Sequence, residues 1–276
     1  MSKKEQTAII IASSSDIGSA MARRWREKAW NVFGTYRTKS CATAELSEIG
    51  VELVHCDLSD NSSVQKACLD LRNLCPLWDN LILSAGSQEP IGFFMSCNFD
   101  DWADSIQVNF TSQLRIVKEL LPNRNTKNKI GPCVLFFAGG GTNNATMNYS
   151  AYTISKIALI KMCELLDAEI PDTRFVIIGP GWVKTKIHQE TILAGERAGE
   201  NYEKTKYKLS SDDCTSMNEV LDCCDWLIHS PQNVISGRNF SVVFDMWGTE
   251  ELSRELINDF NLYKLRRYGN DIFVRK

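Results

Sequence analysis

The sequence lacks any apolar run long enough to cross a membrane. No apolar stretch approaches the roughly 18 residues that a transmembrane helix requires, and the apolar part of the N-terminal segment MSKKEQTAIIIASS is too short for a signal peptide. These absences predict a cytoplasmic protein that has no membrane partner.

An excess of charge of either sign is also missing. The chain has 31 Lys and Arg against 34 Asp and Glu, a formal net charge of −3, and it contains no basic block. This balance argues against nucleic acid as the main partner. Of the 276 residues, 43% are hydrophobic and 24% are charged, which excludes wholesale disorder and predicts a sizeable core.

The ten cysteines include no C-x-x-C pair, and the three histidines lie far apart, at positions 55, 188 and 229. Zinc ligation is therefore unsupported by spacing, and we expect no metal site. In a cytosolic protein, such cysteines are reduced thiols that pack as small hydrophobes.

There is no internal repeat, proline-rich linker or low-complexity segment, so we predict one domain over residues 1–276. Short β-branched or aromatic runs alternate with helix-length segments, such as Ile17–Trp30. This alternation predicts an α/β fold, in which a doubly wound parallel sheet carries helices on both faces in three layers. The predicted strands are Thr7–Ala12, Asn31–Tyr36, Val51–His55, Leu81–Ser84, Pro132–Ala138, Arg174–Ile178 and a last one near Phe240–Phe244.

Two regions depart from this alternation. Residues 184–211 are polar and lack strong periodicity, and they follow the sixth predicted strand. Ligands of doubly wound sheets bind outside the carboxyl ends of the strands, so this region is placed to cover a substrate. Residues 246–276 form a charged C-terminal extension that we expect to be helical, with no obvious role.

The first turn follows a buried strand and opens a helix, with the sequence Ala12-Ser-Ser-Ser-Asp-Ile-Gly18. Such a turn presents backbone N–H groups and a helix N-terminus to a pyrophosphate. It holds only one glycine, and a Ser/Asp turn is also an ordinary helix cap, so the turn alone is a weak indication.

Tyr152 and Lys156 are four residues apart on a predicted helix, which places both side chains on one face. A nearby ammonium group favours the phenolate, so we expect it to lower the tyrosine pKa toward the range of a general acid or base. The same spacing also occurs by chance as a surface pair.

Together, in this order, the two motifs resemble the short-chain dehydrogenase/reductase family, and further landmarks agree from about Thr7 to Thr185. Asp57-Leu58 is similar to the family's adenine contact, Leu83-Ser84-Ala85-Gly86 to its N-A-G turn, and Pro180-Gly181-Trp182-Val183-Lys184-Thr185 to the segment against the nicotinamide. Asn109 matches the helix asparagine that holds a proton-relay water. The resemblance implies a Rossmann fold.

The resemblance also implies a set of site residues. Tyr152 is the proton donor or acceptor, Lys156 lowers its pKa and binds the nicotinamide ribose, and Asn109 supports the water relay. The implied cofactor contacts are Ser14, Ser15, Asp16, Ile17, Gly18, Tyr36, Arg37, Thr38, Asp57, Leu58, Ser84, Ala85, Gly86, Tyr152, Lys156, Pro180, Gly181, Trp182, Val183 and Thr185.

The phosphate turn departs from the family pattern T-G-x-x-x-G-x-G, because Ala12 and Asp16 replace its first two glycines. Ala12 is expected to be tolerable only if its φ is negative. Asp16 can cap the helix, although its charge near a phosphate is a modest penalty. Gly18, which allows close approach of helix and cofactor, is retained.

The family's carbonyl-binding serine is also missing. Aligning the fifth predicted strand places Gly139 at its position, and the segment from Gly139 to Asn144 contains no serine. Thr142 or Asn143 can replace the lost donor if the glycine run bends it inward, with Thr142 the preferred candidate. Alternatively the site lacks the donor, which typically costs ~10²–10³ in rate.

The end of the second predicted strand favours NADP(H) over NAD(H). An NAD-preferring site carries an acid there for the ribose hydroxyls, whereas this chain has Tyr36, followed by Arg37 and Thr38. A guanidinium group suits a phosphate. Arg37 as a solvated loop charge is the alternative.

Near the expected pocket, Trp182 is a candidate to line it, whereas His188 is expected to be exposed. Ser87, Phe93 and Phe94 follow the fourth predicted strand as a possible pocket wall. The helix around Tyr152 has apolar residues on further faces, which predicts core packing and a homodimer or homotetramer interface of the kind the resemblance implies.

The leading interpretation is an NADP(H)-dependent oxidoreductase that reduces a carbonyl, or oxidises the alcohol, of a small substrate. The polar residues Asn143, Asn144, Lys184, Lys186 and His188 favour a hydroxylated or charged compound such as a sugar derivative. The alternative is a cofactor-binding regulator or scaffold with little catalysis, which the missing serine and the glycine-poor turn suggest.

Overall fold

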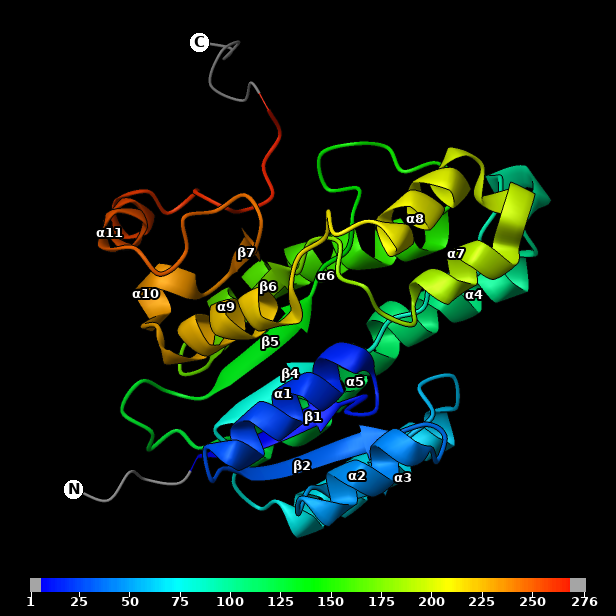
Figure 1. Cartoon of the computed structure of the whole chain (residues 1–276). Coiled ribbons are helices and arrows are strands. Elements are labelled where there is room, and N and C mark those ends of the chain that lie inside the picture. The colour runs from blue at the N-terminus through cyan, green and yellow to red at the C-terminus, as the bar shows by residue number, and fades with distance from the viewer. Residues whose placement is uncertain (1–5, 269–276) are drawn as a thin grey trace.

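Seven parallel strands form the central sheet, in the order β3-β2-β1-β4-β5-β6-β7 (Figure 1). The computed structural model describes residues 6–268. Between β1 and β4 the strand order reverses, and helices cover both faces. This arrangement is the doubly wound, three-layer Rossmann architecture, which confirms the predicted fold class.

Six of the seven predicted strands are found within two residues of their expected bounds. The strands are β1 (Thr7–Ile11), β2 (Asn31–Tyr36), β3 (Glu52–His55), β4 (Asn80–Leu83), β5 (Cys133–Phe137), β6 (Arg174–Gly179) and β7 (Arg238–Ser241). Those at the centre are apolar on both faces, because helices bury both sides of the sheet.

The prediction for the last strand is wrong at its end. β7 stops at Ser241 rather than reaching Phe244. Beyond this point the chain turns, because the Ser241 hydroxyl accepts a hydrogen bond from Phe244 N at 3.2 Å and Asp245 accepts one from Ser241 N. A local side-chain turn therefore ends the strand despite the apolar sequence that follows.

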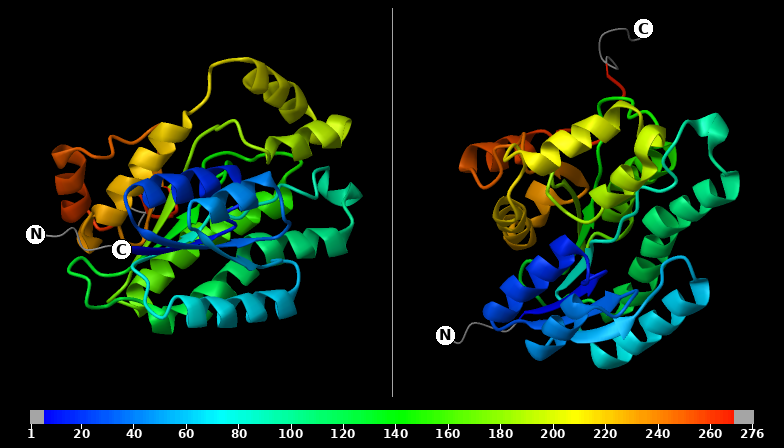
Figure 2. Two further views of the ribbon diagram at one scale, coloured as in Figure 1. Left: turned by 60° about the horizontal axis from the view of Figure 1, so that its bottom comes forward. Right: turned by 45° about the vertical axis from the view of Figure 1, so that its right-hand side comes forward.

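Helices lie on both faces of the sheet (Figure 2), and they bury two separate cores. One core packs under α1, α2, α9, α10 and α11, and the other under α3, α5 and α6. The helices are α1 (Asp16–Glu27), α2 (Cys41–Glu48), α3 (Asn61–Leu74), α4 (Phe99–Ile106), α5 (Ser112–Leu120), α6 (Ser150–Glu169), α7 (His188–Ala194), α8 (Glu200–Ser210), α9 (Met217–His229), α10 (Gln232–Ile235) and α11 (Glu250–Asn258), with a π-helical segment η2 (Gln107–Thr111) between α4 and α5.

Residues 184–211, expected to lack strong periodicity, are largely helical. The buried positions of α7 are His188, Thr191 and Ala194, which follow helical spacing but are polar or small. A hydropathy pattern therefore does not reveal this helix. Figure 1 shows α7 and α8 at one end of the sheet, above α4.

Among residues 246–268 of the C-terminal extension, only α11 is helical, so the expectation of a helical tail is wrong for residues 259–268. Residues 259–268 instead form an irregular segment that hydrogen bonds from β7 hold in place. The buried Arg238 guanidinium donates to the carbonyl oxygens of Asp259, Leu262 and Leu256, and Asn239 N donates to Tyr263 O at 2.9 Å. The part of the prediction that concerns residues 269–276 lies outside the described residues.

All ten cysteines are free, as expected. Burial raises the pKa of Cys56, Cys68 and Cys75 to about 12, so these thiols stay neutral and pack with the core. Within residues 6–268, no group of three or more His, Cys, Asp or Glu side chains is placed to hold a metal ion. In the same range, no helix is long and apolar enough to cross a membrane.

The turn after β1 contradicts the expectation for Ala12, whose φ is +60°. Its N–H donates to Thr35 Oγ1 at 2.9 Å and its carbonyl accepts from Ser15 N at 2.9 Å, so contacts on both sides hold the residue in this conformation. An L-residue other than Gly, Asn or Asp pays about 1–2 kcal/mol in the left-handed region.

We predict that Ala12→Gly stabilises the protein. Glycine relieves the strain at positive φ, and its greater freedom in the unfolded chain offsets part of the gain, leaving roughly 0.5–1 kcal/mol. Denaturant unfolding measures the difference. Ala20→Gly, inside α1, is the matched control and should lose about 1 kcal/mol. A loss of stability in Ala12→Gly would show that the turn favours alanine.

Candidate active site

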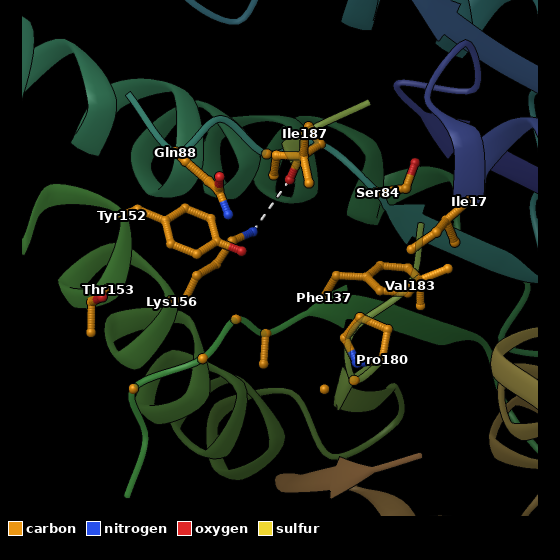
Figure 3. Close-up of a pocket in the computed structure, with 18 of the residues that line it drawn as sticks. Ile17, Ser84, Gln88, Phe137, Tyr152, Thr153, Lys156, Pro180, Val183 and Ile187 are labelled. Atoms are coloured by element: carbon orange, nitrogen blue, oxygen red, sulfur yellow. Dashed lines mark hydrogen bonds between the residues drawn. The ribbon is translucent and has the colours of Figure 1, made fainter. Parts of the chain in front are cut away.

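A cavity of about 1260 Å³ opens at the carboxyl ends of β1, β4, β5 and β6 (Figure 3). Most of the residues expected to bind a cofactor or to take part in catalysis line it. Those present are Ser14, Ser15, Asp16, Ile17, Arg37, Asp57, Leu58, Ser84, Ala85, Gly86, Thr142, Tyr152, Lys156, Pro180, Gly181, Trp182, Val183 and Thr185. Gly18, Tyr36, Thr38 and Asn109 are not among the lining residues.

Tyr152 and Lys156 lie one turn apart on α6 and face this cavity together. The Lys156 Nζ is 5.7 Å from the centre of the Tyr152 ring and donates a hydrogen bond to Ala85 O at 3.3 Å, drawn as the dashed line in Figure 3. Lys156 is only 2% exposed, so its ammonium group is held between α6 and the segment after β4.

The pKa values of the pair differ from the sequence expectation. Burial, with a smaller contribution from the Glu190 carboxylate, raises the pKa of Tyr152 to about 12. Burial lowers the pKa of Lys156 to about 8. Desolvation is thus the dominant effect on the phenol, which is neutral at pH 7.

Asn109 is fully buried in η2, and its side chain is engaged by the backbone after β4. Its Nδ2 donates to Ser87 O at 2.8 Å and to Ser105 Oγ at 3.2 Å, and its Oδ1 accepts from Ser87 N at 3.0 Å. These bonds fix the position of the segment that holds Lys156. The proton-relay role of Asn109 stays a prediction.

Glu190 and Gln88 line the cavity and were missed by the sequence analysis. The Glu190 carboxylate accepts hydrogen bonds from Ser87 Oγ at 3.1 Å and from Gln88 N. Burial raises the pKa of Glu190, although these bonds oppose the rise. Because α7 and the segment after β4 are about a hundred residues apart, no local motif indicates this contact.

Gly139 lies directly against the Tyr152 phenol. A Cβ added at Gly139 would be 2.6 Å from the Tyr152 hydroxyl oxygen and from its Cε1, closer than real Cβ contacts. The phenol thus occupies the space into which any side chain at position 139 would point. A Cβ at the adjacent Gly140, by contrast, meets nothing within 4 Å.

The N-terminus of α1 lies at the other end of the cavity. Ser15 caps the helix by accepting from Gly18 N at 3.1 Å, and Ser84 Oγ donates to Ile11 O at 2.7 Å across β1 and β4. A Cβ on Gly18 would lie 2.6 Å from Ala12 O. Gly18 therefore allows the helix to approach the turn closely.

Comparison with known proteins identifies the family. Residues 11–243 match the family model described as enoyl-(acyl carrier protein) reductase. The chain belongs to the short-chain dehydrogenase/reductase family, whose members are oxidoreductases that bind a nicotinamide cofactor.

Several individual proteins are similar to this chain in sequence or in structure. An uncharacterised oxidoreductase of Schizosaccharomyces pombe is 29% identical over 66% of this chain and 72% of its own. Glucose 1-dehydrogenase 2 of Bacillus subtilis is 26% identical over 86% of this chain and 93% of its own. The structure of an actinorhodin polyketide ketoreductase with NADPH has a TM-score of 0.75, at 19% identity, over 88% of this chain and 97% of that one.

Asp16, which replaces a glycine of the short-chain dehydrogenase turn, points to the segment after β6. Its carboxylate accepts from Lys186 N and lies 3.5 Å from Lys186 Nζ. The positive charge of Lys186 offsets the negative charge of Asp16, which by itself would disfavour a phosphate at this turn. The contact also joins α1 to the segment that leads into α7.

Of the three residues expected to bind the cofactor at the end of β2, only Arg37 lines the cavity; Tyr36 and Thr38 do not. Arg37 is exposed and lines the cavity, whereas Tyr36 packs edge-on against His55 with ring centres 5.7 Å apart. Burial would raise the pKa of Asp57, but hydrogen bonds from Ser59 and the charge of Arg37 outweigh it and lower that pKa. Arg37 and Asp57 therefore lie near one another.

Two expectations for the pocket wall are wrong. His188 is 9% exposed rather than solvated: its ring stacks on Trp182 with centroids 3.9 Å apart, and its Nε2 bonds Val183 O at 2.9 Å. Phe93 and Phe94 are exposed and do not line the cavity, because Phe94 turns outward to meet Trp102. Ser87, the third residue of the expected wall, is also not among the lining residues, whereas its neighbour Gln88 is.

We predict that Gly139→Ala lowers kcat by about 10²-fold, because the new methyl group displaces the Tyr152 ring and misplaced reacting groups cost about that much. Steady-state kinetics measures the loss. Gly140→Ala is the matched control and should keep wild-type kcat, since open space surrounds it. Equal rates for the two variants would mean that the packing of Tyr152 against Gly139 is irrelevant to turnover.

Proposed function

We propose that this protein is an NADP(H)-dependent oxidoreductase that reduces a carbonyl, or oxidises the alcohol, of a small polar substrate with Tyr152 as the acid or base. The observation that carries the proposal is the pairing on α6. A phenol and a buried ammonium group face the same cavity, at the edge where the strands of this family's fold end.

The residues that line the cavity fit a nicotinamide dinucleotide. The cavity exceeds the roughly 300–1,000 Å³ of an ordinary ligand pocket, so there is room for a cofactor and a substrate together. Ser14, Ser15 and Ile17 would hold the pyrophosphate at the α1 N-terminus. Asp57 and Leu58 would hold the adenine, and Lys156 the nicotinamide ribose.

The segment Pro180–Val183 and Thr185 would lie against the nicotinamide. Arg37 would bind the 2′-phosphate, because a guanidinium group forms charge-assisted bonds to phosphate and no acid ends β2 to hold a free ribose hydroxyl. When bound, the cofactor supplies or takes up a hydride at the substrate carbon.

Tyr152 moves the proton in this mechanism. With a pKa of about 12, its hydroxyl is protonated at pH 7 and can donate to the carbonyl oxygen as reduction proceeds. Lys156, with a pKa of about 8, is mostly charged at pH 7 and stabilises the phenolate that remains. In the direction of alcohol oxidation, the phenolate takes up the hydroxyl proton.

A sugar-like substrate agrees with the polar side chains near the cavity mouth. Asn143, Asn144 and Lys186 line the cavity, whereas Lys184 turns away to pair with Asp212 at 3.9 Å. The Bacillus subtilis relative is named for glucose, and D-glucose is therefore a first probe. Ile154 and Leu165 leave apolar surface on α6, which supports the expected homodimer or homotetramer.

We predict that Tyr152→Phe lowers kcat by ~10²–10⁴-fold and leaves NADPH affinity nearly unchanged, because only the proton-transferring hydroxyl is lost. NADPH oxidation with a panel of carbonyl compounds measures the rate, and fluorescence titration measures binding. Tyr207→Phe, on the exposed face of α8, is the control and should behave as wild type. Near-full activity in Tyr152→Phe would exclude the catalytic assignment.

We predict that Arg37→Ala weakens NADPH binding by about 10- to 150-fold and NADH binding far less, since the two cofactors differ only in the 2′-phosphate. Lys39→Ala tests an exposed cation that does not line the cavity, and it should change neither affinity. If Arg37→Ala weakened both cofactors equally, the specificity assignment would fail. Cofactor binding by the wild type without turnover of any carbonyl in the panel would favour the regulator or scaffold.

A further inference from the structure

We propose that the Gln88 side chain donates the second hydrogen bond to the substrate carbonyl oxygen, the contact that a serine at position 139 would otherwise make. This inference rests on the proposed function. A carbonyl oxygen has two lone pairs, and Tyr152 addresses only one of them. Gly139 offers no side-chain donor, and a side chain there would strike Tyr152.

The backbone beside Gln88 is held from two sides. Asn109 bonds both the N–H and the carbonyl of Ser87, at 3.0 and 2.8 Å. Glu190 accepts from Ser87 Oγ and Gln88 N. One anchor comes from η2 and the other from α7, so residue 88 is fixed in position before a substrate arrives, as a catalytic donor requires.

The orientation of the Gln88 amide is fixed as well. Its Oε1 accepts from Thr191 Oγ1 at 2.9 Å, and the same threonine oxygen is 2.9 Å from the hydroxyl of Tyr149. Because the carbonyl end of the amide is held by α7, the NH₂ end points the other way. Figure 3 shows the Gln88 nitrogen directed toward the Tyr152 hydroxyl and the Lys156 ammonium group.

The Gln88 Nε2 forms no hydrogen bond with any residue in the range 6–268, although the side chain lines the cavity. The Ser87 N–H, carbonyl and hydroxyl groups, the Gln88 N–H and the Gln88 Oε1 are all engaged within the protein. An unengaged amide donor that is directed toward the proton-donating phenol can stabilise the negative charge on a carbonyl oxygen during hydride addition.

The two donors expected from the sequence, Thr142 and Asn143, are held less firmly than Gln88. Thr142 and Asn143 follow the glycine run, and Asn143 is exposed to solvent. No hydrogen bond orients either side chain toward Tyr152 among the described residues. A preorganised donor stabilises a transition state more than one that must be ordered during the reaction, which favours Gln88.

The test is Gln88→Met, which keeps an unbranched side chain of similar length and removes the donor. We expect kcat to fall by about 10²-fold, with KM changed only a few-fold and NADPH affinity unchanged, because the lost bond strengthens as charge develops on the oxygen. Reduction of diacetyl with NADPH and oxidation of D-glucose with NADP are the two reactions measured. Gln189→Met is the matched control, since this glutamine is exposed on α7 and does not line the cavity.

The conservative variant Gln88→Glu separates a donor from a packing role. Glutamate has the same shape but accepts hydrogen bonds when ionised, so we expect its kcat to be at least as low as that of Gln88→Met. Wild-type kcat in Gln88→Met with a folded protein overturns the inference, as does a large loss in Thr142→Val that Gln88→Met does not share.

Failure of this inference can be told apart from failure of the proposed function. If Tyr152→Phe abolishes turnover while Gln88→Met retains it, only the role of Gln88 is wrong. If wild-type protein binds NADPH but turns over neither diacetyl nor D-glucose nor any other carbonyl of the panel, the proposed function fails, and the role of Gln88 fails with it.

Discussion

The geometry of the candidate active site depends on residues Ala85 to Gln88, in the segment that follows β4. Ala85 O accepts a hydrogen bond from the Lys156 ammonium group, and the Asn109 side chain bonds both the N–H and the carbonyl of Ser87. The Glu190 carboxylate accepts a hydrogen bond from Gln88 N. A Cβ on Gly86 would lie 3.7 Å from Lys156 Nζ and 3.8 Å from Asn109 Oδ1. This segment therefore joins α6, η2 and α7, and it sets the positions of the groups that face the cavity.

The absence of a side chain at Gly139 is the second constraint. It leaves room for the Tyr152 ring to pack against the backbone after β5, where the phenol is desolvated and its pKa rises. Because of this packing, a serine at position 139 would require the Tyr152 ring to move, so the glycine is part of the local structure. In the proposed reaction, a second donor to the carbonyl oxygen would come from another residue.

The sequence predicted the sheet well because strands buried on both faces have a strong signal, as in TAIIIA and CVLFF. It failed where side-chain hydrogen bonds override hydropathy, as at Ser241, where β7 ends. It also missed α7, whose buried face is polar or small. The irregular segment after α11 could not be predicted, because the buried Arg238 holds it through hydrogen bonds to backbone carbonyls, which any sequence provides.

By itself, the sequence determined the strand and helix alternation, the family motifs, and the pairing of Tyr152 with Lys156, because these depend on local spacing. Only the tertiary structure decided the φ of Ala12, the burial of His188, the raised pKa of Tyr152, and the convergence of Gln88 and Glu190 on the cavity. Each depends on desolvation or on a contact between segments far apart in the chain. Such contacts exist only after the strands and helices have packed, so no window of sequence contains them.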